Sequence, residues 1–185
     1  MQYTTLGRSG LVVSRICLGG NSWGSAGRRA WAAMDAAASA PFFHRALDLG
    51  INFFDTADMY NLGASEEAMG AHLLRAVPRE DLVICTKVGM PMGTGPNQSG
   101  LGRKHMMASI DASLRRLRTD HVDVYMLHRY DPETPAEEIV ATLADIVRAG
   151  KARHVAASTM RPTQLARMQT IAKANGLPTF AAMQN

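Results

Sequence analysis

Four side chains in this sequence are of types that exchange protons, and each lies at or just after the end of a short apolar run. Asp55 directly follows one such run, and Tyr60 lies five residues further on. Lys87 and His128 end the next two apolar runs. Taken singly, a lysine or a histidine at the end of a strand is most often a structural or surface group. Taken together, a carboxylate, a phenol, an ammonium and an imidazole can act as general acids and bases.

The phenol and the ammonium decide what this chemistry could be. A free phenol, with a pKa of roughly 10, is a weak acid near neutral pH. A lysine ammonium about 4 Å away would stabilise the phenolate by ~4 kcal/mol at an effective dielectric constant of about 20, which corresponds to about three pKa units. Burial alone would push a lysine towards neutrality by ~3 to 5 units, so an adjacent carboxylate is needed to keep it charged. Asp55 is the candidate for that carboxylate.

Six β-rich apolar runs must position these side chains, and segments with helical spacing separate the runs. The expected strands are Arg15 to Leu18, Ile51 to Phe54, Leu82 to Lys87, Val122 to His128, Arg153 to Ser158 and Thr179 to Gln184. Helical spacing is clear from Met106 to Leu117 and from Ile139 to Val147, and the alanine-rich segment 30–40 also predicts a helix. Gly50 and Gly150 stand where helices end, just before a strand. This alternation predicts an α/β fold with a parallel sheet.

The positions of the polar residues favour a closed barrel over an open, doubly wound sheet. Five successive expected strands end in polar residues, and such groups converge on one point only if the strands form a ring around it. We therefore predict that residues 1–185 form a single domain, the first six units of a (β/α)8 TIM barrel. A β-hairpin, formed by Tyr3 to Leu6 and Leu11 to Ser14, is expected to precede it. No G-x-G-x-x-G turn follows a strand, which argues against a Rossmann fold.

The chain resembles the aldo-keto reductase superfamily over essentially its whole length. The stretches that carry the resemblance are Leu49 to Tyr60 with Ser65 to Glu67, Thr86 with Lys87, Val122 to Asp131, and Gly150 with Lys151 leading into Ala157 to Thr159. Matched residue by residue, the catalytic tetrad of that family falls on Asp55, Tyr60, Lys87 and His128.

The resemblance implies an NADP(H)-dependent oxidoreductase that reduces aldehydes or ketones to alcohols, with Tyr60 as the general acid. Negative charge builds on the carbonyl oxygen as hydride reaches the carbonyl carbon, so a phenol beside an ammonium is a suitable proton donor. His128 would either hydrogen-bond the carbonyl oxygen and set its angle or share the proton donation. The alternative function is a regulatory or sensor module of the same fold that holds the cofactor with little turnover.

The resemblance also implies where the cofactor binds. The contacts to the nicotinamide carboxamide would fall on Ser158, Thr159 and Gln184. Thr159 stands where the family commonly has an asparagine, and its hydroxyl can likewise donate and accept a hydrogen bond. NADPH is favoured over NADH by the resemblance and by the basic isoelectric point of about 9.4.

Two loops are further candidates for contacts at the site. After the first strand, Gly20 and Asn21 are candidates for cofactor binding, while Trp23 is either a wall of the substrate pocket or a plain core aromatic. The glycine-rich segment Gly89 to Gly102 is expected to be a flexible loop at the catalytic rim, either part of the substrate mouth or a mobile insertion.

Composition excludes several other classes of protein. The net charge of +4 comes from scattered basic residues, as on a solvated surface, so nucleic acid is not an expected partner. No apolar run approaches the ~20 residues that span a membrane, and the first residues lack the apolar region of a signal peptide. We therefore expect a cytoplasmic protein, and the resemblance implies that its partner is a small aldehyde or ketone.

Metal sites and disulfides are not expected either. The six histidines show no metal-binding spacing, which disfavours a barrel hydrolase that would use Asp55 and His128 around a metal. Cys17 and Cys85 each lie within an apolar run and are expected to be buried, reduced thiols.

The length of the sequence is short for the expected fold. A full eight-unit barrel needs about 250 residues, whereas Asn185 follows directly on the sixth expected strand. We expect that two further strand–helix units belong to the complete barrel and that the 185 residues alone are inactive.

Overall fold

A six-stranded parallel sheet forms the centre of the computed structural model, which describes residues 1–24 and 34–185. Its strands lie in the order β3 (Cys17–Gly19), β4 (Phe53–Asp55), β5 (Val83–Val88), β6 (Val122–Leu127), β7 (Ala152–Ser158) and β8 (Phe180–Gln184). The spatial order follows the chain without a reversal, whereas a doubly wound sheet reverses its strand order at a switch point. The predicted α/β architecture and all six expected strands are confirmed, with bounds that differ by one or two residues.

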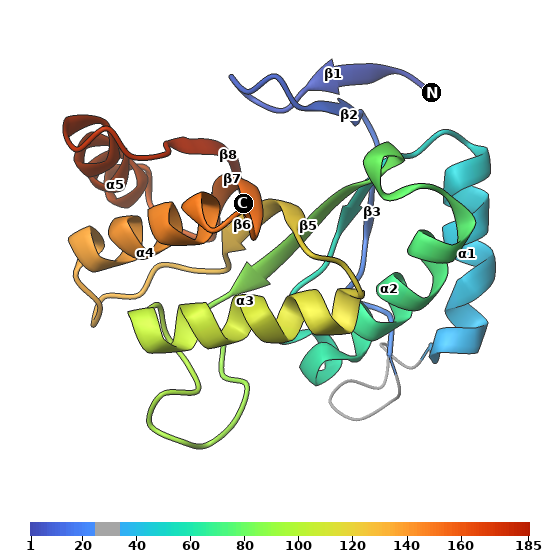
Figure 1. Ribbon diagram of the computed structural model, residues 1–185, viewed down its shortest axis with the longest axis horizontal. Coiled ribbons are helices and arrows are strands. Elements are labelled where there is room, and N and C mark those ends of the chain that lie inside the picture. Colours follow the sequence, from blue (N-terminus) through green and yellow to red (C-terminus); the bar gives the residue numbers. More distant parts are fainter. Residues whose placement is uncertain (25–33) are drawn as a thin grey trace.

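Helices connect successive strands and lie outside the sheet (Figure 1). They are α1 (Ala36–Asp48), α2 (Ala64–Ala76), α3 (Arg103–Leu117), α4 (Ala136–Arg148) and α5 (Pro162–Ala174), with short 3-10 turns at η1 (Tyr60–Gly63) and η2 (Arg79–Asp81). Gly50 and Gly150 follow α1 and α4 with φ angles of 78° and 74°, the left-handed conformation expected of a glycine just past a helix end. Of the expected helix at 30–40, residues 36–40 lie in α1 and residues 30–33 are outside the described part of the chain.

Side chains alternate between the two faces of the sheet. Outward residues such as Phe54, Tyr125 and Val155 join the helices in the main hydrophobic core. Inward residues form a second, smaller cluster, made of Cys85, Val124, Met126 and Ala156. Because the central strands are covered on both faces, β5 and β6 are buried at every position, as in other parallel sheets.

The sheet is curved as a section of a barrel. The side chains of Asp55 on β4 and Gln184 on β8 approach to 3.5 Å between Oδ2 and Nε2. Four strand spacings separate β4 from β8 in the strand order, which would place them about 19 Å apart in a flat sheet. Only strong curvature brings the two side chains together, so the structure supports the predicted partial barrel.

An N-terminal hairpin spans one end of this curved sheet. It consists of β1 (Tyr3–Thr5) and β2 (Val12–Ser14), which pair in antiparallel fashion as predicted. The Ser14 backbone N–H donates to Asn52 Oδ1, at 2.7 Å, just before β4. At the other side the Gly7 backbone lies against β8, so closely that a Cβ on Gly7 would be 2.0 Å from the Ala181 carbonyl oxygen. Figure 1 shows the hairpin at the end of the sheet opposite the 89–102 loop.

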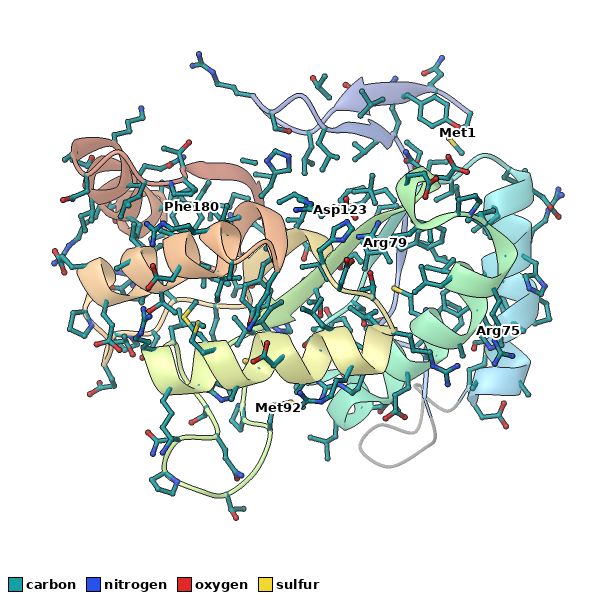
Figure 2. The ribbon with its side chains drawn as sticks, in the orientation of Figure 1. Met1, Arg75, Arg79, Met92, Asp123 and Phe180 are labelled. Atoms are coloured by element: carbon teal, nitrogen blue, oxygen red, sulfur yellow. The ribbon has the colours of Figure 1, made fainter. Side chains whose placement is uncertain are left out.

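A partly buried arginine, Arg79, fixes the neighbouring ends of β5 and β6. Arg79 forms an ion pair with Asp123 at 2.6 Å and donates to the Leu82 carbonyl at 2.8 Å. Asp123 also accepts the backbone N–H of Ile84 at 2.8 Å. Figure 2 labels Arg79 and Asp123, which lie at the end of the sheet below the hairpin. This network fixes the start of β5, and Lys87 lies near the opposite end of the same strand.

One sequence-based expectation about the cysteines is wrong. Both are free thiols and Cys85 is buried, but Cys17 is exposed. Cys17 belongs to β3, which has a neighbouring strand on one side only within the described sheet, so its apolar surroundings do not enclose it.

None of the helices among the described residues is long and apolar enough to cross a membrane.

Candidate active site

Lys87 is the centre of a buried polar cluster at the carboxyl ends of the strands. Its Nζ donates to Asp55 Oδ2 at 2.6 Å, to the Thr56 carbonyl at 2.9 Å and to Tyr60 Oη at 3.3 Å. The lysine is 1% exposed, so all three hydrogens of its ammonium have protein acceptors and none depends on bulk water. The three acceptors come from β4 and the loop after it, whereas the lysine comes from β5.

The charge of Lys87 results from two opposed effects. Burial is the larger single influence on its pKa and lowers it, because an ammonium loses its hydration inside the protein. The negative charge of Asp55, followed by contributions from Cys85 and Tyr60, more than offsets burial and raises the pKa above its ordinary value. Lys87 is therefore a permanent cation at neutral pH.

Backbone hydrogen bonds hold the segment after β4 against β5 and so place Tyr60 beside Lys87. Beyond Asp55 the chain continues beside β5, since Thr56 N–H donates to the Cys85 carbonyl at 2.9 Å and Asp58 N–H donates to the Lys87 carbonyl at 3.1 Å. Tyr60 N–H then turns back to the Ala57 carbonyl at 3.1 Å. The five-residue spacing between Asp55 and Tyr60 thus covers the continuation of the strand and one tight turn.

His128 completes the cluster from the next strand. Its ring stands at 85° to the ring of Tyr60, with 5.6 Å between the centroids. Lys87 Nζ lies 4.9 Å from the centroid of the Tyr60 ring, a distance at which the cation also attracts the ring electrons. The structure therefore brings together all four residues that the sequence predicts for the tetrad.

The imidazole of His128 is neutral at neutral pH. Burial, and then the charge of Lys87, lower its pKa from the ordinary value of 6.5 to about 4. Its Nδ1 is buried without a hydrogen-bond partner among the described residues. A neutral imidazole with an unoccupied ring nitrogen can accept or donate one hydrogen bond, depending on its tautomer.

The residues expected to contact the carboxamide lie beside this cluster. Ser158 ends β7, is 4% exposed and has its hydroxyl 3.0 Å from the Thr159 hydroxyl. Gln184, at the end of β8, reaches Asp55 at 3.5 Å. The Thr159 N–H donates to the Gln184 carbonyl at 3.1 Å, which links β7 to β8 at this rim.

Thr159 has a backbone conformation that its side chain disfavours. Its φ angle is 48°, in the left-handed region where β-branched residues are rare and where asparagine is tolerated. Asparagine, which the resemblance implies is common at this position, tolerates this backbone conformation better than threonine does. The sequence alone did not indicate this reason.

Replacing Thr159 by asparagine should relieve this strain. We expect the free energy of unfolding to rise by about 1 kcal/mol, measured by urea denaturation. Thr159→Val is the matched control, because valine keeps the β-branch and loses only the hydroxyl. An equal gain in both variants would contradict the backbone explanation.

The loop after β3 is placed mainly by packing. Gly20 is buried, its N–H donates to the Asp55 carbonyl at 2.7 Å, and a Cβ there would meet Ser65 Oγ at 2.8 Å. Asn21 is exposed. Trp23 is 5% exposed and packs on Phe43 of α1 with 5.2 Å between ring centroids, as expected of a core aromatic.

A second group of buried charges lies behind the sheet and was not singled out from the sequence. Glu66 of α2 is fully buried, accepts from Thr86 Oγ1 at 2.5 Å and forms an ion pair with Arg116 of α3 at 2.6 Å. Asp58, two residues before Tyr60, is also fully buried. Acidic residues in a loop and a first helical turn are ordinarily exposed, so only their packing between α2, α3 and β5 distinguishes them.

Within the described residues, no group of three or more histidine, cysteine or acidic side chains could hold a metal ion.

A sequentially ordered parallel sheet, curved around a buried ammonium and carboxylate and a partly buried phenol and imidazole, defines a (β/α)-barrel protein with an acid–base site at the carboxyl ends of its strands. The model of the aldo/keto reductase family matches residues 15–185 of this chain. The chain belongs to the aldo/keto reductase family.

Several curated relatives match the whole chain. It is 40% identical to versiconal hemiacetal acetate reductase of Aspergillus parasiticus, over 100% of this chain and 59% of the relative. It is 37% identical to an aldo-keto reductase of Metarhizium robertsii, over 100% and 56% of the two chains, and 36% identical to one of Alternaria alternata, over 99% and 56%. The chain thus spans between 56% and 59% of the length of these relatives.

Proposed function

We propose that this protein takes part in the reduction of an aldehyde or ketone to an alcohol with NADPH as the hydride donor, and that Tyr60 protonates the carbonyl oxygen. The observation that carries the proposal is the placement of Lys87 Nζ between Asp55 Oδ2 at 2.6 Å and Tyr60 Oη at 3.3 Å in a buried site. A fixed cation beside a phenol supports its use as an acid, because it stabilises the phenolate that remains after the proton has left.

Asp55 has an indirect but necessary role in this proposal. Without its charge, burial would lower the pKa of Lys87 and so weaken the field that stabilises the phenolate. Asp55 accepts the shortest hydrogen bond of the ammonium, whereas Tyr60 accepts a longer one. The proton that reaches the substrate oxygen comes from Tyr60 Oη, and Lys87 keeps its own three.

His128 orients the carbonyl oxygen. The residue type alone is compatible with two roles, orienting the substrate or sharing the proton donation. A pKa of about 4 favours orientation, since the imidazolium that would donate a proton is scarce at neutral pH. One N–H of the neutral ring, which lies edge-on to the Tyr60 ring, can donate to the carbonyl oxygen.

The residues at the ends of β7 and β8 fit a nicotinamide carboxamide. The amide of the ligand needs both a donor and an acceptor, and the hydroxyl of Ser158 with the side-chain amide of Gln184 offers both beside Asp55. When bound, the cofactor supplies the hydride. Thr159 fixes the rim between the two strands, while Ser158 and Gln184 would hold the carboxamide of the cofactor.

The proposal is tested by following NADPH oxidation at 340 nm with a panel of aliphatic and aromatic aldehydes and ketones. The complete protein encoded by the open reading frame is the sample. Oxidation that depends on the carbonyl compound, with deuterium from 4-deuterated NADPH appearing on the alcohol carbon, would support the proposal. Tight NADPH binding without oxidation across the panel would overturn it in favour of a regulatory or sensor module.

A further inference from the structure

The turn that carries Tyr60 has a backbone conformation that its side chains disfavour. Asn61 and Leu62, the two residues after Tyr60, have φ angles of 48° and 55°, in the left-handed region. Asparagine tolerates this region, but leucine is rarely found there, because its Cβ lies too close to the following carbonyl oxygen. Leu62 is also 48% exposed, so burial of its side chain offsets little of the cost. Such a conformation persists only where the surrounding structure holds it.

The first turn of α2 connects this strained turn to the end of β4. The strained turn ends at Gly63, and α2 begins at the next residue. Ser65 Oγ lies 2.8 Å from Thr56 Oγ1, just beyond β4, and both residues are 0% exposed. Thr56 is also the residue whose carbonyl accepts from Lys87 at 2.9 Å. In Figure 1, α2 lies between α1 and α3, with which it packs.

Glu66 makes the corresponding contact to β5. Its Oε1 accepts from Thr86 Oγ1 at 2.5 Å, and Thr86 directly precedes Lys87 in the strand. Its Oε2 pairs with Arg116 of α3 at 2.6 Å. Arg116 packs on Gly63 so closely that a Cβ there would lie 2.5 Å from the arginine Cδ. A single buried carboxylate thus connects β5, α3 and the end of the strained turn.

We infer that Glu66 is a positioning residue, whose hydrogen bond to Thr86 holds the strained turn against β5. Without this bond the turn relaxes towards an ordinary backbone conformation, and Tyr60 Oη moves away from Lys87 Nζ. The strand cannot follow this movement, because β5 is paired with β4 on one side and with β6 on the other. The inference rests on the proposed function, since it gives Glu66 a part in the use of Tyr60 as the acid.

The expected size of the effect follows from the distance between Lys87 Nζ and Tyr60 Oη. An increase from 3.3 Å to about 5 Å would reduce the stabilisation of the phenolate by a factor of roughly 20 in the equilibrium constant, at an effective dielectric constant of about 20. Only part of this change appears in the transition state, so we expect kcat to fall by roughly 5- to 10-fold. The proposed carboxamide residues lie at the ends of β7 and β8, so KM for NADPH should stay close to the wild-type value.

Thr86→Val in the complete protein tests the bond, because it removes the hydroxyl that donates to Glu66 and keeps the β-branch. It should lower kcat for NADPH oxidation by this factor, and Thr86→Ser, which keeps the hydroxyl, should retain most of the activity. Thr142→Val is the matched control, since Thr142 of α4 is also 0% exposed and donates to the Glu138 carbonyl at 2.7 Å. Equal losses of kcat in the two valine variants, or wild-type kcat in Thr86→Val, would overturn the inference.

A second substitution separates the holding of a strained turn from a general effect on stability. Leu62→Asn lowers the strain, because asparagine tolerates the left-handed conformation. The turn then needs less support, so Thr86→Val should cost about 2-fold or less in kcat when it is compared with Leu62→Asn alone. The same 5- to 10-fold loss in both backgrounds would contradict the proposed role of the bond.

A structural measurement tests the inference independently of turnover. Lys87 Nζ lies 4.9 Å from the centroid of the Tyr60 ring, so protein with labelled lysine and tyrosine should show nuclear Overhauser contacts between the two side chains. These contacts should be weaker in Thr86→Val than in the wild type and Thr142→Val. If the wild type oxidises no NADPH, the proposed function fails, and unchanged contacts in Thr86→Val would still refute the role of Glu66.

Discussion

Replacement of Tyr60 by phenylalanine is expected to lower kcat/KM for carbonyl reduction by about 10²- to 10⁴-fold, the range that a positioned general acid ordinarily contributes. Phenylalanine keeps the ring that faces His128 at 85° and removes only the hydroxyl that accepts from Lys87 at 3.3 Å. The loss should therefore appear in the chemical step, with NADPH binding largely retained.

Stopped assays of NADPH oxidation and quenching of tryptophan fluorescence by NADPH separate these two effects. The matched control is Tyr3→Phe, because Tyr3 Oη donates to the Gly50 carbonyl at 2.8 Å near the hairpin, at the other end of the sheet. Tyr3→Phe should keep full activity. Undiminished reduction by Tyr60→Phe would show that another group donates the proton.

Asp55→Asn is expected to impair both activity and stability. The asparagine leaves the Lys87 ammonium buried at 1% exposure without its charged partner, and the loss of one member of a buried ion pair costs about 3–5 kcal/mol. Burial then dominates and lowers the pKa of Lys87, so the amine tends to become neutral and no longer stabilises the phenolate. We expect kcat to fall together with the free energy of unfolding.

The pH dependence of stability distinguishes a lowered pKa of Lys87 from a nonspecific destabilisation of the fold. In the wild type the pKa of Lys87 is raised, so its stabilisation is fully present below the ordinary value of 10.5 and is lost as the pH rises through the folded-state value. In Asp55→Asn the lowered pKa reverses the sign, and the variant should gain stability relative to the wild type between about pH 7 and pH 10.

Urea denaturation at pH 7, 8.5 and 10 measures this difference. Asp111→Asn is the control, because Asp111 and Lys151 also approach to 2.6 Å but are 44% and 29% exposed at their side chains. Exposed pairs contribute less than about 1 kcal/mol, so this variant should remain close to the wild type at each pH. A constant deficit of Asp55→Asn across the three pH values would contradict the proposed origin of the Lys87 charge.

The sequence predicted the fold well because the relevant signals are local. The runs that became β5 and β6 are apolar except at Thr86, Lys87 and Asp123, which is typical of strands covered on both faces. Polar residues at the strand ends then indicated a ring, and the contact between Asp55 and Gln184 supports it. The bounds of the strands differed by one or two residues, since strand ends depend on neighbours that no local pattern specifies.

Features that depend on packing could not be predicted in the same way. The left-handed backbone of Thr159 and the exposure of Cys17 follow from how β7 meets β8 and from the place of β3 at the edge of the sheet. Asp58 was part of the stretch that carried the family resemblance, yet its burial without a partner is visible only when α2, α3 and the 89–102 loop are in place. No local sequence pattern distinguishes a buried acidic residue in a loop from an exposed one.

The hairpin that spans the sheet has a consequence for the order in which the protein can fold. Its strands leave the ribosome before the six strands of the sheet, and Gly7 docks against Ala181, which is synthesised far later. Until β8 has joined the sheet, the hairpin lacks the contact between Gly7 and Ala181, although Ser14 can already bind Asn52. Contacts between such distant parts of a sequence form slowly, because a long loop must close first. The hairpin is thus made before the strand on which Gly7 docks, and we expect it to be among the last parts of this fold to reach its final position.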